Sequence, residues 1–312
     1  MRLVQSTVML AAVVSGVDLG PSTSAQVGPP ETREALTVTA TWLADHLADP
    51  DLVILHVGDP AEYRLAHVPG ARLAALVDFY AEPDGRELSV ELPTADRLRR
   101  TLQDLGVSDD STIVVYCGRN WYAPTTRVIF TLTAAGLGAQ TRLLDGGMPA
   151  WVRAGHPTTA GVPKPRKGKL SPLQMLPLVV DAEFVRSRAS APNLAIVDAR
   201  ARPFYDGEAR ARRDSELRGH IPGALNVPHT ELFDETGALR PANELAALFV
   251  KAGIEPGETV LGYCHAGLQA TAMLFAARTL GHHVLLYDGS IEDWALLRNL
   301  PLETSGNGGE WW

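Results

Sequence analysis

The chain has 312 residues, of which 46% are hydrophobic and 21% are charged, and this composition is typical of globular proteins with sizeable cores. The length exceeds one average domain and suits two domains of about 130 to 150 residues. The 28 Lys and Arg residues against 36 Asp and Glu residues give a net charge of -8, which does not favour a nucleic-acid surface. Two cysteines do not make a disulfide framework, nor a metal site by themselves.

The N-terminal segment has the pattern of a secretory signal peptide. Arg2 precedes an apolar run over residues 8–14, and small residues lead to Ala25. This pattern predicts a signal peptide over residues 1–25 and therefore a periplasmic or secreted protein. The alternative is a frayed leader or a short helix on a cytoplasmic protein. Because the apolar run is too short for a secure membrane span, we expect no stable membrane association.

An internal repeat divides the rest of the chain. The apolar run 113–117, which ends in Cys117, matches the run 260–264, which ends in Cys264, 147 residues later. The residues around these runs match in the same order. The matched landmarks are Gly106 with Gly253, His67–Ala71 with His220–Ala224, and Asp145-Gly146 with Asp288-Gly289. Such a repeat predicts a duplicated domain.

Each copy alternates strand and helix patterns, which the second copy shows most clearly. The expected strands of that copy are 194–198, 260–263 and 283–287, and its expected helices are 242–251 and 268–280. We therefore expect an α/β fold with two tandem domains, each a mostly parallel sheet flanked by helices. The predicted boundaries are 38–157 for the first domain, 158–175 for a linker, and 176–305 for the second domain.

A thiol at the end of a strand is the main chemical feature of the second copy. Cys264 is followed by a short loop that contains Gly267 and then by the expected helix. Loop N–H groups and the positive end of the helix dipole would point at the sulfur, which lowers a thiol pKa and holds an anion beside it. Gly267 lets the backbone curl close to the sulfur. The alternative is that Cys264 is a small buried side chain on a core strand.

Three features of the second copy occur together. A strand ends in Cys264 before a short loop and a helix, His-Ile-Pro-Gly-Ala precedes it at 220–224, and Asp288-Gly289 with Trp294 follow it. Together they resemble the rhodanese family, and the tandem layout resembles the thiosulfate and mercaptopyruvate sulfurtransferases. The resemblance implies two tandem rhodanese-like domains, with the catalytic site in the second domain near its interface with the first.

The resemblance assigns the chemistry to Cys264. It implies that sulfur passes from a small anionic donor, thiosulfate or mercaptopyruvate, through a persulfide on this cysteine to a thiol or cyanide acceptor. The persulfide cradle would be His265, Ala266, Gly267, Leu268 and Gln269. Backbone N–H groups can stabilise an anionic outer sulfur without protonating it, which agrees with this reading. We expect no metal and no cofactor beyond the transient persulfide.

The loop departs from the family pattern, which leaves the donor open. Thiosulfate-preferring members carry Arg directly after the cysteine and mercaptopyruvate-preferring members carry Gly, whereas this chain has His265. His265 can hold the donor anion or assist proton transfer, or it can be a solvent-facing loop residue. Arg200, in an Asp-x-Arg pattern that ends a strand, is the best candidate for donor binding or loop support. Asp288 is expected to cap a turn.

Cys117 occupies the matching strand end in the first copy, but its loop differs. The stretch from this cysteine to the shared helix-end glycine is two residues longer than in the second copy, and it contains Trp121 and Tyr122. First domains of the family are usually inactive, so we expect Cys117 to be noncatalytic, with a reactive or resolving thiol as the alternative. A disulfide between Cys117 and Cys264 stays open at this stage.

Two other functions compete with sulfur transfer. Cysteine phosphatases and arsenate reductases share this architecture, but their longer loop ends in Arg, whereas Ala270 lies six residues after Cys264. This function is therefore disfavoured. A noncatalytic rhodanese-like binding or sulfur-carrier module stays open, because a fold does not by itself imply catalysis. Turnover with a small donor and acceptor separates an enzyme from such a module.

Overall fold

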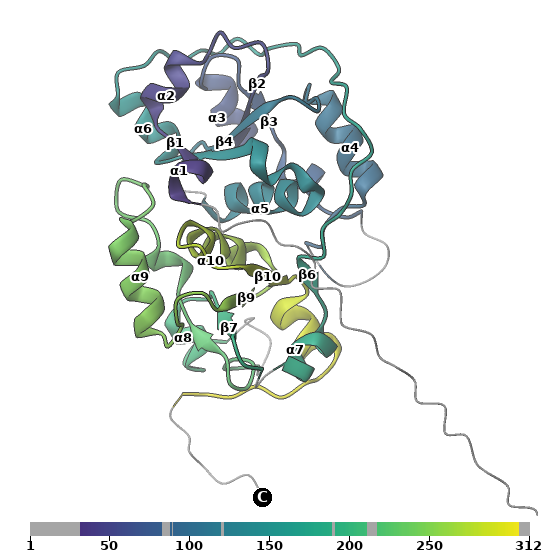
Figure 1. The fold of residues 1–312 in the computed structure, drawn as a ribbon, viewed down its shortest axis with the longest axis vertical. Coiled ribbons are helices and arrows are strands. Elements are labelled where there is room, and N and C mark those ends of the chain that lie inside the picture. Colours follow the sequence, from purple (N-terminus) through teal and green to yellow (C-terminus); the bar gives the residue numbers. More distant parts are fainter. Residues whose placement is uncertain are drawn as a thin grey trace, which may run out of the picture.

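Two parallel sheets, one in each half of the chain, form the frame of the protein (Figure 1). The computed structural model describes residues 32–82, 88, 90–119, 122–188, 191–210 and 217–305. The signal peptide predicted over residues 1–25 lies outside the described residues. The expected α/β fold with two tandem domains is confirmed.

The first sheet has the strand order β1-β5-β4-β2-β3. Its strands are β1 (Thr37–Val38), β2 (Leu52–Val57), β3 (Arg72–Leu73), β4 (Thr112–Cys117) and β5 (Thr141–Leu144), and all neighbours are parallel. The central strands β2 and β4 pair up to Val57 opposite Cys117. Their near-continuous Val, Ile and Leu runs are buried, as parallel strands covered on both faces require.

The second sheet repeats this topology with the order β6-β10-β9-β7-β8. Its strands are β6 (Val179–Val180), β7 (Leu194–Asp198), β8 (Leu225–Asn226), β9 (Thr259–Tyr263) and β10 (Val284–Tyr287), again all parallel. The three strands predicted for this domain correspond to β7, β9 and β10 within one residue at each end. The register puts Asp198 opposite Tyr263, so the ends of β7 and β9 lie side by side.

Helices cover both faces of each sheet. The first domain contains α1 (Arg33–Leu36), α2 (Ala40–Asp45), α3 (Pro60–Leu65), α4 (Ala95–Asp104), α5 (Tyr122–Leu132) and α6 (Gly147–Arg153). The second contains α7 (Ala182–Arg188), α8 (Arg202–Tyr205), α9 (Ala242–Lys251) and α10 (Leu268–Thr279). Short 3-10 helices lie at Leu76–Phe79, Gly138–Gln140 and His229–Glu231, and π-helical turns at Thr133–Leu137 and Glu292–Leu297. Helix α9 has the predicted bounds, and α10 ends one residue before its prediction.

The main hydrophobic core continues from one domain into the other. Helices α5 and α10 pack against each other between the two sheets (Figure 1), and one buried cluster includes Val128 of α5 and Leu274 of α10. Thr126 and Thr271 share a hydrogen bond of 3.0 Å between their hydroxyl oxygens. The interface between the domains is therefore as buried as a domain core.

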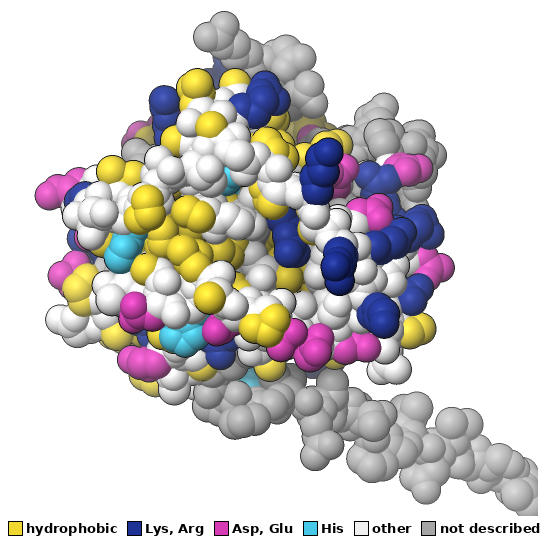
Figure 2. All heavy atoms as spheres, turned by 90° about the horizontal axis from the view of Figure 1, so that it is seen from above, with side chains coloured by type: hydrophobic (Ala, Val, Ile, Leu, Met, Phe, Trp, Pro, Cys, Tyr) yellow, Lys and Arg dark blue, Asp and Glu magenta, His cyan; other side chains and the backbone are white. Residues whose placement is uncertain are grey.

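The outer surface is of mixed chemical character. The face at the first-domain end carries basic and acidic side chains together with a group of hydrophobic ones (Figure 2). Within the described ranges, no helix has the length and apolar character needed to cross a bilayer. The same residues contain no group of three or more His, Cys, Asp or Glu side chains placed to hold a metal ion.

Candidate active site

Cys264 lies where β9 ends, at the carboxyl edge of the second sheet, where open α/β sheets place their ligands. The strand end is fixed on both sides. The Tyr263 hydroxyl accepts the Ile221 N–H at 3.0 Å, and the Cys264 N–H donates to the Ser290 hydroxyl at 3.1 Å. The Cys264 carbonyl accepts the Ile291 N–H at 3.2 Å. These contacts hold the strand end, and with it the position of the thiol, on the neighbouring loops.

The loop after Cys264 directs backbone N–H groups at the sulfur. Gly267 adopts a left-handed φ of +79° and caps the start of α10. Burial raises the pKa of the Cys264 thiol, which is 1% exposed, while N–H groups of Ala270, Ala266 and Gln269 act in the opposite direction. The predicted lowering of the thiol pKa is therefore wrong for the free thiol, because burial outweighs the N–H groups.

The five predicted cradle residues have different positions around the sulfur. Ala266 and Gln269 supply N–H groups to it, as does Ala270, which lies one residue beyond the predicted cradle. Gly267 shapes the turn, and Leu268 is the first residue of α10. The side-chain oxygen of Gln269 is buried and, among the described residues, has no hydrogen-bond partner.

His265 packs beside the site as a neutral ring. Its imidazole meets Phe204 edge-on with ring centroids 4.8 Å apart, and its carbonyl accepts the Glu292 N–H at 3.0 Å. Burial, followed by the nearby positive charge of Arg200, lowers the pKa of His265 to about 4. At neutral pH this imidazole carries no charge, so it can offer a hydrogen bond but no positive charge to a donor.

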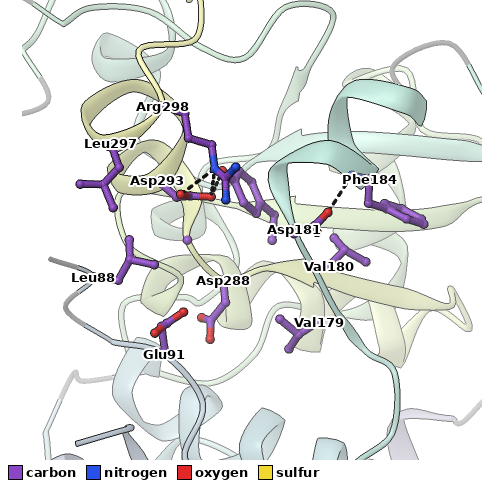
Figure 3. A pocket seen from close by; sticks show the side chains of 12 residues that line it. Leu88, Glu91, Val179, Val180, Asp181, Phe184, Asp288, Asp293, Leu297 and Arg298 are labelled. Atoms are coloured by element: carbon purple, nitrogen blue, oxygen red, sulfur yellow. Dashed lines mark hydrogen bonds and ion pairs between the residues drawn. The ribbon is translucent and has the colours of Figure 1, made fainter. Parts of the chain in front are cut away.

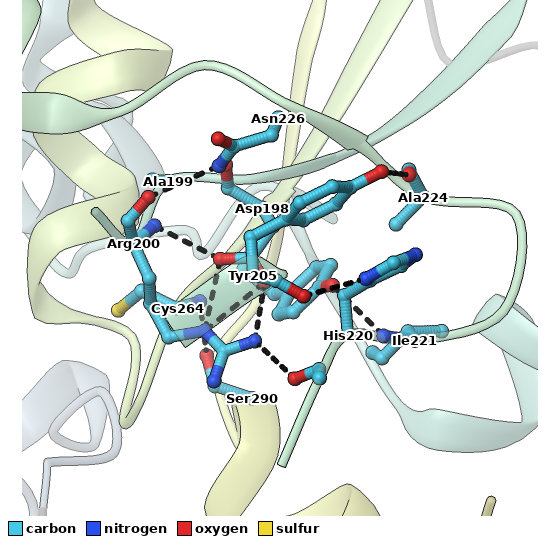
Figure 4. A network of polar contacts seen from close by, with 12 residues as sticks. Asp198, Ala199, Arg200, Tyr205, His220, Ile221, Ala224, Asn226, Cys264 and Ser290 are labelled. Carbon is cyan, nitrogen blue, oxygen red and sulfur yellow. Dashed lines mark hydrogen bonds and ion pairs between the residues drawn. The ribbon is translucent and has the colours of Figure 1, made fainter. Parts of the chain in front are cut away.

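Arg200 forms a buried ion pair underneath the site (Figure 4). Its Nε lies 3.0 Å from both carboxylate oxygens of Asp198, and its Nη2 lies 2.5 Å from Oδ2 and 2.7 Å from the Gly219 carbonyl. Burial opposes the charge, but Asp198 raises the pKa of Arg200. Because Arg200 is only 1% exposed and pairs with Asp198, this geometry favours support of the strand end over donor binding.

The matching position in the first domain lacks this ion pair. His56 and Gly58 of the first domain occupy the places of Asp198 and Arg200 relative to the central strands. His56 is 1% exposed, and its Nδ1 lies 2.9 Å from the Tyr116 hydroxyl. Cys117 is buried, as is Cys264, and neither of the two is in a disulfide.

The longer loop after Cys117 is only partly described, because Trp121 lies outside the described residues. Tyr122, the other bulky residue of that loop, stacks on Phe233 of the second domain with centroids 4.1 Å apart. A Cβ at Gly237 would overlap the Tyr122 hydroxyl. The second domain therefore covers this side of the first-domain loop.

A cavity of about 650 Å³ opens between the domains at Asp288 rather than at Cys264 (Figure 3). Its lining includes carboxylates of Glu91, Asp181, Asp288 and Asp293, with the Arg298 Nε donating to Asp293 at 2.8 Å. Two of these carboxylates are paired with arginines, Asp288 with Arg127 and Asp293 with Arg298. The residues that line the cavity do not include Cys264, so the cavity is separate from the thiol.

Two contacts near the site escaped sequence reasoning. The Ser290 hydroxyl, which holds the Cys264 N–H, lies in the second copy's Asp-Gly turn region but belonged to no recognised motif. Arg127, from the first domain, binds Asp288 and the Gly267 carbonyl. No local sequence signal connects Arg127 with a cysteine far along the chain.

The fold, the repeat and the strand-end thiol define a class of two-domain α/β proteins. Comparison with known proteins shows which family this is. The rhodanese-like domain family matches residues 39–154 and 181–297. The chain therefore belongs to the rhodanese-like domain family. The 3-mercaptopyruvate sulfurtransferase of Escherichia coli (strain K12) is 31% identical over 278 residues, which cover 85% of this chain and 97% of that protein.

Other relatives extend this result. Sulfur carrier protein TtuD of Thermus thermophilus is 30% identical over 85% of this chain and 95% of its own length. The crystal structure of YnjE superposes with a TM-score of 0.77 at 26% identity, over 88% of this chain and 70% of that one. With the strand-end cysteine, this similarity identifies the chain as an enzyme of the sulfurtransferase class.

Proposed function

We propose that the protein moves sulfane sulfur from a small anionic donor, through a persulfide on Cys264, to a thiol or cyanide acceptor. The observation that supports this most strongly is the convergence of N–H groups from Ala266, Gln269 and Ala270 on one buried sulfur. Such donors stabilise a negative sulfur without protonating it. Sulfur transfer forms an anionic sulfur at this position in one half-reaction and releases it in the other, and these N–H groups stabilise the negative charge in both.

The first half-reaction loads the cysteine. The Cys264 thiolate attacks the outer sulfur of thiosulfate, a new S–S bond forms, and the donor's S–S bond breaks as sulfite leaves with the electron pair. With mercaptopyruvate, the carbon–sulfur bond breaks instead, and pyruvate leaves as its enolate and takes a proton from solvent. In the second half-reaction, cyanide or an acceptor thiolate attacks the outer sulfur, and Cys264 leaves as the thiolate.

Recognition of the donor would rest on backbone groups rather than on a guanidinium. Arg200 is paired with Asp198, and His265 is neutral at pH 7 because burial lowers its pKa to about 4. The related proteins include one named for mercaptopyruvate and one from Arabidopsis thaliana named for thiosulfate and 3-mercaptopyruvate, which is 28% identical over 86% of this chain. We therefore propose thiosulfate and mercaptopyruvate as the donor types to compare.

Turnover with each donor, using cyanide and a small thiol as acceptors, tests this function. We expect Cys264→Ser to abolish turnover and Cys117→Ser to retain most of it, with both variants folded by circular dichroism. Equal losses in the two variants would contradict the assignment of the second domain as the catalytic one. A persulfide that forms on Cys264 but reaches neither small acceptor would instead support the sulfur-carrier alternative.

We also propose that the protein is exported. Support comes from the sequence alone: Arg2, the apolar run 8–14, and small residues up to Ala25. N-terminal sequencing of protein expressed from the full chain in its own cells, after fractionation, tests the proposal. A mature protein that begins at Gln26 is expected, and a cytoplasmic protein that retains residues 1–25 would contradict it.

A further inference from the structure

A buried arginine of the first domain reaches the cradle loop of the second. Arg127 of α5 is 0% exposed, and its two terminal nitrogens lie 2.5 and 3.0 Å from the two carboxylate oxygens of Asp288. Nη1 also lies 3.2 Å from the Gly267 carbonyl oxygen, and Nη2 lies 2.6 Å from the Val90 carbonyl. The Leu92 N–H completes the group by donating to Asp288 at 3.0 Å.

This ion pair fixes the part of the loop that aims N–H groups at the sulfur. Gly267 lies between Ala266 and Gln269, and both of these residues supply an N–H to Cys264. Its carbonyl shares one peptide plane with the next N–H of the loop, so holding the Gly267 carbonyl also sets the path of the backbone into α10. A guanidinium that binds two carboxylate oxygens and a carbonyl is a rigid planar anchor for that path.

The loop also has no room to move toward Arg127. A Cβ at Gly267 would overlap the Asp288 Oδ1 and would lie 3.2 Å from the Arg127 Nη1. The backbone of the loop therefore rests directly on the ion pair. A shift of either charged group would be passed to the cradle.

We infer that Arg127 is a positioning residue for sulfur transfer: through Asp288 and the Gly267 carbonyl, the first domain holds the persulfide cradle of the second. This inference rests on the proposed function and assigns the first domain a part in it. Arg127 does not touch the reacting sulfur. It acts by keeping the cradle N–H groups in place.

The repeat offers a second ion pair for comparison, at the position in the first domain that matches Asp288. The Leu239 N–H donates to Asp145 at 2.8 Å, which mirrors the bond from the Leu92 N–H to Asp288, because Leu92 matches Leu239 and Asp145 matches Asp288 in the repeat. At Asp145, however, the bound cation is Arg33 of α1, at 2.8 Å, and the position that matches Arg127 in α10 is Ala272.

The two ion pairs thus differ in the backbone groups that their arginines contact. Arg33 donates to the Leu239 and Arg240 carbonyls of the second domain, whereas Arg127 donates to the cradle loop. Both pairs connect the domains, but only the one at Arg127 includes a residue of the loop after Cys264. The pair formed by Arg33 and Asp145, whose side chains are 22% and 21% exposed, is therefore a control for general loosening of the interface.

The test compares two charge-free double variants of the full chain. Arg127→Met with Asp288→Asn removes the pair at the cradle without leaving a lone buried charge, and Arg33→Met with Asp145→Asn does the same at the control position. For each protein, the rate of Cys264 alkylation by iodoacetamide is followed against pH by mass spectrometry. Single-turnover persulfide formation and thermal unfolding are measured in parallel.

We expect the cradle variant to form persulfide about 10- to 100-fold more slowly, the scale of loss that small misplacements of a reacting group produce. Its alkylation profile should shift to higher pH by about one unit, because fewer N–H groups reach the sulfur. The control variant should keep the wild-type profile and a rate within about twofold, even if its melting temperature falls as much. Arg127→Lys, which keeps a charge but not the planar fork, should give an intermediate rate.

Two results would overturn the inference. One is a folded cradle variant with the wild-type profile and rate, and the other is a control variant that loses as much rate as the cradle variant. Failure of the proposed function is recognised separately. If the wild-type protein forms no persulfide with either donor, sulfur transfer is contradicted, while the alkylation profiles still decide whether Arg127 positions the cradle.

Discussion

Replacement of Gly267 by alanine tests how tightly the cradle is packed. Two effects add at this position. The left-handed φ of +79° costs a residue with a Cβ about 1 to 2 kcal/mol. The new Cβ would also overlap the Asp288 Oδ1 and lie 2.7 Å from the Asp288 carbonyl oxygen, and overpacking of this kind costs about 1 to 3 kcal/mol.

A second glycine isolates the packing effect. Gly257 has a φ of +88°, and a Cβ there would meet nothing within 4 Å, so Gly257→Ala carries only the backbone cost. Urea unfolding of both variants should therefore show Gly267→Ala to be less stable than Gly257→Ala by about 1 to 3 kcal/mol. Single-turnover persulfide formation should fall only in Gly267→Ala, because the loop must move away from Asp288.

The result that would refute this reasoning is specific. Gly267→Ala and Gly257→Ala would unfold at the same urea concentration, and both would form persulfide at the wild-type rate. The close approach of the loop to Asp288 would then have no energetic consequence. The cradle would not depend on its contact with the ion pair.

Three further predictions concern buried ionisable groups. Arg200→Ala leaves the Asp198 carboxylate buried without its partner, so urea unfolding should show a loss of about 3 to 5 kcal/mol; a loss below about 1 kcal/mol would mean that the pair is not buried in solution. Burial lowers the pKa of His56 to about 4, so the unfolded chain binds a proton before the folded chain does as the pH falls. The free energy of unfolding, which is not reduced by this group well above pH 6.5, should therefore drop by about 2.5 kcal/mol at pH 4.5. His56→Gln should remove that part of the pH dependence. Because burial raises the pKa of the Cys264 thiol, persulfide formation should keep rising about tenfold per pH unit beyond about pH 8.5, where an ordinary cysteine thiol titrates. His265, with a pKa of about 4, should add no inflection near pH 6.5.

The sequence predicts the fold well because the repeat and the strand patterns are local signals. Helix α9 has its predicted bounds because Ala242–Lys251 combines an amphipathic pattern with a terminating Gly253. The strand-end position of Cys264 follows from the apolar run before it. Such features depend on neighbours in the chain and are therefore visible without a structure.

The features of the site that sequence reasoning missed depend on tertiary contacts. Arg127 reaches Gly267 only because α5 and α10 pack against each other, and its counterpart by repeat, Ala272, gives no hint of this role. The direction of the pKa shift at Cys264 depends on the balance between burial of the thiol and the loop N–H groups. No sequence motif specifies that balance. The Asp-x-Arg pattern is the same whether Arg200 binds a donor or pairs with Asp198, so the sequence alone does not distinguish these two roles.

Site-resolved mass spectrometry of the protein, exposed separately to thiosulfate and to mercaptopyruvate, tests the central claim most directly. The account predicts one added sulfur atom on Cys264, removable by cyanide, and none on Cys117. The relative extent of loading ranks the two donors. The absence of added sulfur on Cys264 with either donor, or its appearance on Cys117 alone, would contradict the account.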